Sequence, residues 1–173
     1  MEALEAMLTR KSIKKYKPDP VPRELIDQII AAGLNAPSGL NKQAPIIIAV
    51  TNKEIRDKLS KLNAGKDPFF RADPFYGAPV VLVVLADKSA FTYLYDGSLV
   101  MENLQLAAHA LGLGACWIHR AKETFESSEG KEILASLGIE GDYEGIGNCI
   151  LGYAAAEIPA PKPRKENYVY YIK

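Results

Sequence analysis

A run of cationic side chains near the start of the chain has the residue types to bind an anion. Residues 9–20 read TRKSIKKYKPDP and carry five Lys or Arg side chains in their first nine positions. If this stretch is extended, side chains alternate between faces, so Arg10, Ser12 and Lys14 would share one side. Two cations and a hydroxyl at this spacing match a phosphate and a second anionic or carbonyl group of one ligand. The alternative is a solvated basic turn after a helix.

A second polar stretch, NAPSGLNKQAP, occupies residues 35–45. It offers the short polar side chains of Ser38, Asn41 and Gln43, and Gly39 allows a close backbone approach. The alternative is an ordinary loop, because Pro, Ser, Gly and Asn are also the common turn residues.

A third cationic group lies among prolines near the end of the chain and consists of Lys162, Arg164 and Lys165. By itself it would be a solvated tail. Beyond it, side chains alternate as in an edge strand, at Tyr168, Tyr170 and Ile172. Such a tail suits addition to the sheet of another subunit, and the alternative is a frayed terminus.

Composition narrows the class of protein. Lys plus Arg equals Asp plus Glu at 21 each, so we expect neither nucleic acid nor a membrane as a partner. The two cysteines, Cys116 and Cys149, have no metal-ligand or CxxC spacing, which disfavours a disulfide framework or a zinc site. No apolar run is long enough to span a bilayer, and the first residues are too acidic for a signal peptide. The chain is predicted to be a cytoplasmic protein with a single domain over residues 1–173.

Helix and strand patterns alternate along the chain. Apolar spacing and proline positions predict helices over 2–9, 22–36, 54–62, 90–111 and 127–139. Short β-branched or apolar runs predict strands over 45–52, 79–87 and 145–155, and GLGACWIH at 112–119 predicts a turn followed by a strand. The segment 63–78 has no period and is expected to be a long loop. This order has an α/β alternation, but no Gly-rich phosphate loop joins a strand to a helix, and GLGACW matches GxGxxG only in part.

The stretches together resemble the nitroreductase family of flavin-dependent oxidoreductases. The sequence RKSIKKYKPDPVPRELIDQIIAAGLNAPSGLNKQAP is similar to the family's opening, with an Arg-x-Ser-x-Lys element, a helix and an Ala-Pro-Ser-x-x-Asn-x-Gln motif. The resemblance continues through APVVLVV, ENLQLAAHALGLGACWI, LGIE, ILGYA and KPRK. It implies an α+β fold with a mostly antiparallel central sheet flanked by helices, in an intertwined homodimer that holds FMN at its interface.

The resemblance also implies roles for individual residues. Arg10 and Ser12 would hold the FMN phosphate, helped by the Lys11 backbone, and Lys14 would reach the pyrimidine edge of the ring. The other subunit would contribute the loop residues Pro37, Ser38, Gly39 and Asn41. The GLGACWIH stretch would place Trp117 and Ile118 beside the ring, and the backbone N–H near His119 would face flavin N5. The tail would return to the phosphate through Lys162 and Arg164.

In such a protein the cofactor carries the reaction, and the resemblance implies NADH or NADPH as hydride donor in a ping-pong scheme. The acceptor would be a small molecule: a nitroaromatic, a quinone or a flavin. No catalytic acid or base is expected. Relatives often have Gly or Glu after the Ile of CWI, where this chain has His119 and Arg120. Alternatives are a flavoenzyme of the same fold with other chemistry, such as dehalogenation or flavin breakdown, and a non-catalytic flavin-binding protein.

Overall fold

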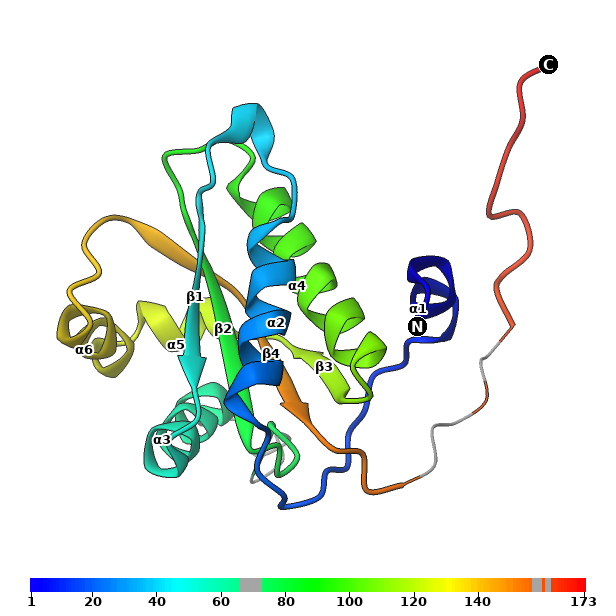
Figure 1. Cartoon of the computed structure of the whole chain (residues 1–173). Helices are drawn as coiled ribbons and strands as arrows, with labels where there is room; N and C mark the ends of the chain where they lie inside the picture. Colours follow the sequence, from blue (N-terminus) through cyan, green and yellow to red (C-terminus); the bar gives the residue numbers. More distant parts are fainter. Residues whose placement is uncertain (66–72, 157–159, 161–162) are drawn as a thin grey trace.

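The computed structural model describes residues 1–65, 73–156, 160 and 163–173, and Figure 1 shows its elements. In chain order they are α1 (Ala3–Thr9), α2 (Arg23–Leu34), the 3-10 helix η1 (Gly39–Asn41), β1 (Pro45–Val50), α3 (Lys53–Ala64), β2 (Val80–Asp87), α4 (Tyr93–Ala110), β3 (Gly114–Ile118), α5 (Ala121–Glu126), α6 (Ser128–Ser136) and β4 (Tyr143–Gly152). Every helix and strand predicted from the sequence is present. The short helix α5 was not predicted.

The four strands form one sheet in the order β1-β2-β4-β3, and each neighbouring pair is antiparallel. The α/β alternation of the sequence therefore does not produce a parallel sheet. The chain between α3 and β2 returns to the end where β1 finished, so Val50 pairs with Val81 and β2 runs in the opposite direction. This confirms the α+β class with an antiparallel sheet.

Helices cover both faces of the sheet. The helices α2 and α4 lie on one face, and α3, α5 and α6 lie on the other (Figure 1). In β2, Leu82 and Val84 face the first layer, while Val81 and Val83 face the second, and all four are fully buried. A strand covered on both sides has no solvated face, which explains the continuous apolar run of β2 in an antiparallel sheet.

The long helix α4 packs in the core on one side and is apolar at its surface too. Met101 and Leu104 are fully buried, whereas Leu94, Tyr95 and Leu99 are exposed. The predicted apolar circumference is confirmed, and it leaves hydrophobic surface uncovered in the single chain. Among the described residues, no helix has the length and apolar character to cross a membrane.

The strand β1 lies at the edge of the sheet, and no strand of the described chain pairs with its outer side. An apolar groove of about 270 Å³ lies beside it, lined among others by Ile48, Ile55, Phe125, Ile133 and Leu137. The tail over residues 163–173 forms no strand within its own chain and extends away from the body (Figure 1). All of its side chains are exposed.

Candidate functional site

The basic stretch after α1 lines a cavity with alternate side chains. Ser12 and Lys14 both line a cavity of about 420 Å³, while Ile13 between them is buried at 8% exposure. The backbone lies beside β3, because Ser12 forms a parallel bridge with Ala115 and the Ile13 N–H donates to the Ala115 carbonyl at 2.9 Å. The predicted alternation is thus confirmed for residues 12–14.

A glycine in β3 permits this close approach. A Cβ atom built at Gly114 would lie 2.9 Å from Cβ, Cγ1 and Cγ2 of Ile13. The Tyr16 hydroxyl fixes the other side by donating to the Ile13 carbonyl at 2.7 Å. These contacts hold Ser12 and Lys14 in register at the cavity.

Arg10 lies at the C-terminal end of α1, and one of its hydrogen-bond donors is buried without a partner among the described residues. Its Nε is 3.7 Å from a Glu102 carboxylate oxygen, too long for a hydrogen bond. Its Nη1 is buried and has no hydrogen-bond partner among the described residues. Unpaired buried polar groups are costly, so a cationic donor of this kind fits an anionic ligand. Arg10 is not among the cavity-lining residues, and it acts electrostatically on Cys116 in the cavity wall.

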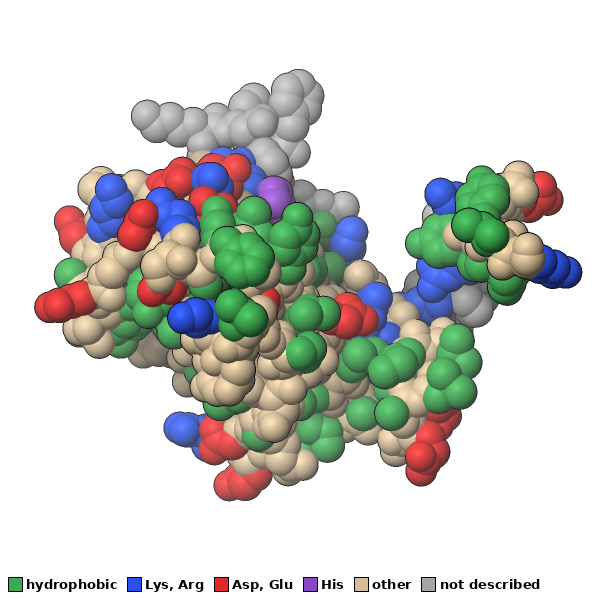
Figure 2. All heavy atoms as spheres, turned by 90° about the horizontal axis from the view of Figure 1, so that it is seen from above, with side chains coloured by type: hydrophobic (Ala, Val, Ile, Leu, Met, Phe, Trp, Pro, Cys, Tyr) green, Lys and Arg blue, Asp and Glu red, His purple; other side chains and the backbone are tan. Residues whose placement is uncertain are grey.

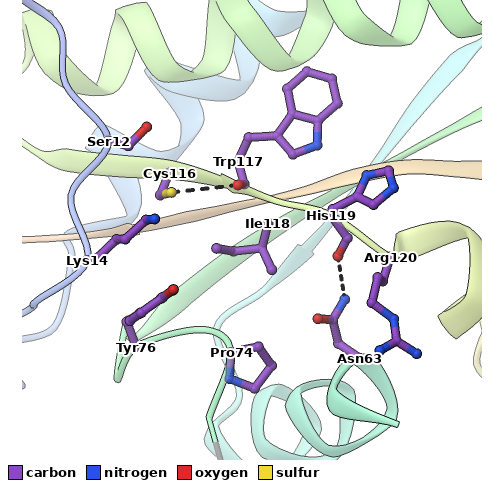
Figure 3. Close-up of a pocket in the computed structure, with 10 residues that line it drawn as sticks. All are labelled: Ser12, Lys14, Asn63, Pro74, Tyr76, Cys116, Trp117, Ile118, His119 and Arg120. Atoms are coloured by element: carbon purple, nitrogen blue, oxygen red, sulfur yellow. Dashed lines mark hydrogen bonds between the residues drawn. The ribbon is translucent and has the colours of Figure 1, made fainter. Parts of the chain in front are cut away.

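One wall of the cavity is β3, from which Cys116 and Ile118 contribute (Figure 3). Burial raises the pKa of the Cys116 thiol, against the opposing effects of Ser12, Lys14 and Arg10, so the thiol stays neutral. Trp117 also lines the cavity, but its indole points toward α4. There it packs over Gly147, where a Cβ atom would lie 2.5 Å from Trp117 Nε1.

The chain turns sharply where β3 ends, at His119 and Arg120. Arg120 has a φ of 73°, in the left-handed region. Its Nη1 donates to the Ala64 carbonyl at 3.3 Å, and the Asn63 side chain donates to the His119 carbonyl at 2.8 Å. The end of α3 is thereby joined to this corner, and Asn63, His119 and Arg120 all line the cavity (Figure 3).

The opposite wall is the turn 73–77, which brings Pro74 and Tyr76 to the cavity. The Asp73 carboxylate holds this turn in place through hydrogen bonds. That carboxylate accepts hydrogen bonds from Arg56 Nη2 at 2.7 Å, Ser60 Oγ at 2.7 Å, and the backbone N–H groups of Phe75 and Gly77 at 3.0 and 2.7 Å. Burial alone would raise the pKa of Asp73, but the hydrogen bonds and the Arg56 charge outweigh it and hold the pKa below its usual value.

The cavity is cationic. Its lining includes the cationic side chains of Lys14 and Arg120, and no carboxylate side chain is among the described residues that line it. Since Lys plus Arg and Asp plus Glu are equal in number over the whole chain, this local excess is a property of the site. It favours an anionic ligand.

The predicted residues of the 35–45 stretch lie elsewhere. Pro37 and Ser38 line a second cavity of about 230 Å³, and the described linings of the two cavities have no residue in common. The loop is held by Asp96, whose carboxylate accepts from the Gly39 N–H at 3.0 Å. Asn41 is exposed and accepts from the Gln43 amide at 3.1 Å. Figure 1 places this loop at the top of the molecule, away from residues 10–16. A single chain does not bring the two stretches together.

The remaining predicted residues have three different outcomes. Lys11 is half-buried and does not line the cavity. Arg164 is exposed in the tail, so the single chain does not bring it to the cavity. Lys162 lies outside the described residues. Outside the predicted set, His109 in α4 packs against α1, with its Nε2 at 2.8 Å from the Thr9 hydroxyl.

Sequence reasoning missed the residues that complete the cavity: Asn63, Pro74, Tyr76, Cys116 and Arg120. The segment 63–78 carried no periodic signal, although its Pro and Gly residues mark a turn. The sequence showed that His119 and Arg120 differ from the Gly or Glu that relatives often have after the Ile of CWI. It did not show that this corner contacts the end of α3.

The fold and cavity together define an α+β protein with one described antiparallel sheet and a cavity lined by cationic and aromatic side chains. The family model of the nitroreductase family matches residues 7–153. The chain therefore belongs to the nitroreductase family.

Relatives and solved structures agree with this assignment. An "FMN reductase [NAD(P)H]" from Bacillus subtilis is 28% identical over 180 residues, covering 94% of this chain and 70% of that protein. A Methanothermobacter thermautotrophicus protein whose name includes "NAD(P)H nitroreductase" is 36% identical over 126 residues. That match covers 68% of this chain and 60% of the relative. The crystal structure of a nitroreductase with bound FMN from Bacteroides fragilis superposes with a TM-score of 0.87 at 26% identity, covering 100% of both chains. The corresponding values for the FMN-bound nitroreductase from Desulfitobacterium hafniense are 0.88, 27% and 100% of both chains.

Proposed function

We propose that this protein is an FMN-dependent oxidoreductase that uses NADH or NADPH to reduce a small molecule. The observation that carries the proposal is the cavity whose described lining includes cations and no carboxylate, together with the buried Nη1 of Arg10, which has no partner among the described residues. Two solved members of the same fold, matched over their full length, are described as having bound FMN. The cavity volume also lies in the range typical of ligand sites.

The residues present fit FMN. Arg10 and Ser12, with the backbone of Lys11, would hold the phosphate, because an arginine fork and a hydroxyl suit phosphate oxygens. Lys14 would lie at the pyrimidine edge of the ring, and residues 117–119 would lie beside it. The proposed contributions of a second subunit are Pro37, Ser38, Gly39 and Asn41, and those of the tail are Lys162 and Arg164.

Bound FMN would accept a hydride at N5 from NADH or NADPH and pass it to a nitroaromatic, a quinone or a flavin. The protein's part is binding and electrostatics. Lys14 would stabilise the negative charge that develops on reduction. One open face would serve donor and acceptor in turn, which is a ping-pong scheme. No side chain is assigned as acid or base.

We further propose that the protein is a homodimer of single-domain subunits. The exposed apolar side chains of α4 need a cover, and hydrophobic side chains stand clear of the body on the tail (Figure 2). The free edge of β1 and its apolar groove match a tail of alternating apolar residues from a second copy. A dimer would also supply the loop of Pro37 and Ser38 to the cavity that the single chain leaves incomplete.

The proposed chemistry is tested by colour. Purified protein is expected to show the absorbance bands of oxidised flavin, and anaerobic NADH or NADPH is expected to bleach them. Regain of the bands on adding a nitroaromatic, quinone or flavin completes the cycle. A flavin-containing protein that neither donor bleaches would be a flavin-binding protein without this activity, and a colourless protein that FMN does not restore would contradict the proposal.

Replacing Leu99 with lysine is expected to give a monomer. Leu99 is 44% exposed on the apolar surface of α4, so a charge there would be buried unpaired in the proposed interface. Analytical ultracentrifugation should give twice the 18.9 kDa chain mass for the parent protein and the single mass for Leu99→Lys, with weaker FMN binding. The control is Glu132→Lys on α6, an exposed position outside the groove beside β1 and away from α4, which should stay dimeric. A fully dimeric Leu99→Lys variant would place the interface elsewhere.

A further inference from the structure

We propose that Tyr76, held by the Asp73 turn, is a positioning residue that fixes the Lys14 ammonium at the cavity and thereby sets how strongly the site favours reduced over oxidised FMN. The inference rests on the proposed function and goes beyond it, because it concerns a turn that is assigned no role in binding the cofactor. Three observations carry it: the contact of Tyr76 with Lys14, the strained backbone of Tyr76, and the hydrogen bonds of Asp73.

The first observation is the contact between the two side chains. The Lys14 Nζ lies 5.8 Å from the centre of the Tyr76 ring, within the range of a cation–π interaction. Both side chains line the same cavity and approach it from different segments, Lys14 from the stretch beside β3 and Tyr76 from the turn before β2 (Figure 3). A lysine has a long, flexible side chain, so a neighbour that limits its rotamers decides where its charge lies.

The second observation is the backbone of Tyr76, whose φ is 54°. A non-glycine residue in the left-handed region is strained by roughly 1–2 kcal/mol. Such a conformation persists only where the surroundings impose it, and it is commonest at functional sites. In this turn the conformation directs a tyrosine into the cavity.

The third observation is the set of hydrogen bonds that holds the turn in its conformation. The Asp73 carboxylate has four donors, and two of them, the N–H groups of Phe75 and Gly77, are the backbone on either side of Tyr76. The other two come from α3, through Arg56 and Ser60, which are both buried. Arg56 also donates from Nε to the Ala78 carbonyl at 3.0 Å. Tyr76 is therefore tied to the helical layer, and it presents a fixed aromatic surface to Lys14.

A positioned cation acts differently on the two redox states. A lysine ammonium at the ring stabilises the negative charge of reduced FMN and does little for the neutral oxidised ring. Without Tyr76, Lys14 keeps its charge, but its ammonium group is no longer held at the cavity. Binding of reduced FMN should then weaken more than binding of oxidised FMN, whereas general loosening of the fold would weaken both alike.

The test is the midpoint potential of FMN bound to the holoprotein, measured by spectroelectrochemistry, for Tyr76→Leu, Tyr76→Phe, Lys14→Met and the double variant. Tyr76→Leu is expected to lower the preference for reduced FMN about threefold, which is about 14 mV for a two-electron couple. Tyr76→Phe, which keeps the ring, should match the parent. Lys14→Met should lower the preference about tenfold, and Tyr76→Leu should add nothing to it. Lys17→Met, an exposed lysine of the same stretch, is the control.

Each other outcome overturns the inference. An unchanged potential in Tyr76→Leu, alongside a shift in Lys14→Met, removes the role of Tyr76 and leaves the proposed function intact. If Tyr76→Leu shifts the midpoint potential equally in the parent and in Lys14→Met, the effect of Tyr76 does not depend on Lys14. Parent protein that binds no FMN removes the proposed function as well. If Tyr76→Leu does not fold, Asp73→Asn releases the same turn and must give a shift of the same sign.

Discussion

FMN binding is expected to weaken about 30- to 150-fold when Arg10 is replaced by alanine. The Nη1 atom of Arg10 is buried without a partner among the described residues, and the side chain is 24% exposed. A charged hydrogen bond to phosphate in such surroundings is worth about 2–3 kcal/mol, which corresponds to this loss of affinity. Isothermal titration of flavin-free protein with FMN measures it. Riboflavin, which lacks the phosphate, should bind the parent and the variant equally.

The control for Arg10 is Lys17→Ala. Lys17 belongs to the same basic stretch but is exposed, and its backbone N–H donates to the Tyr153 carbonyl at 2.8 Å, a bond that alanine keeps. FMN affinity within twofold of the parent is expected for Lys17→Ala. Equal affinity losses in the two variants would mean that the stretch acts through its total charge, and the assignment of Arg10 to the phosphate would be wrong.

Replacement of Gly145 by alanine is expected to lower the free energy of unfolding by about 3 kcal/mol. A Cβ atom there would lie 2.3 Å from the backbone C and O atoms of Ala121 and 2.7 Å from the Lys122 nitrogen. Backbone atoms cannot rotate away, so α5 would have to separate from β4. Because α5 begins directly after His119 and Arg120, the cavity corner would move with it. Urea denaturation measures the loss, and thermal unfolding should begin roughly 6–12 °C lower.

Gly138→Ala separates this clash from the general cost of replacing a glycine. Gly138 has a φ of 68°, and no atom lies within 4 Å of its built Cβ. Only backbone strain of about 1 kcal/mol is expected there, with FMN affinity unchanged. A Gly145→Ala variant as stable as Gly138→Ala would show that α5 does not pack against β4 as closely as described.

The elements could be predicted from the sequence because their signals are local. The β-branched run at 45–50 and the apolar spacing of α2 are properties of consecutive residues. The helix α5 was not predicted because it has only six residues and follows Arg120, a residue with left-handed backbone that provides no side-chain cap. The antiparallel direction of the strands was likewise not visible in the α/β alternation. It followed only from the family resemblance.

The candidate site was predictable in part for the same reason. The shared face of Ser12 and Lys14 follows from a two-residue period, whereas the opposite wall depends on pairs far apart in the chain. Asp73 meets Arg56 across 17 positions, and Asn63 meets the His119 carbonyl across 56. No local pattern encodes such contacts. The predicted loop of Pro37 and Ser38 lines a different cavity in the single chain, and its place beside the first cavity belongs to the proposed dimer, which no local pattern encodes.

The open edge of β1 has a consequence for how the protein must be made. A strand edge that has no partner in the described chain and lies beside an apolar groove is a template on which another extended chain can pair. On a ribosome, the residues after β4 emerge later than β1, so in the proposed dimer each nascent molecule passes through a stage with that edge uncovered. Overproduction should therefore favour inclusion bodies, and refolding yield should fall as protein concentration rises.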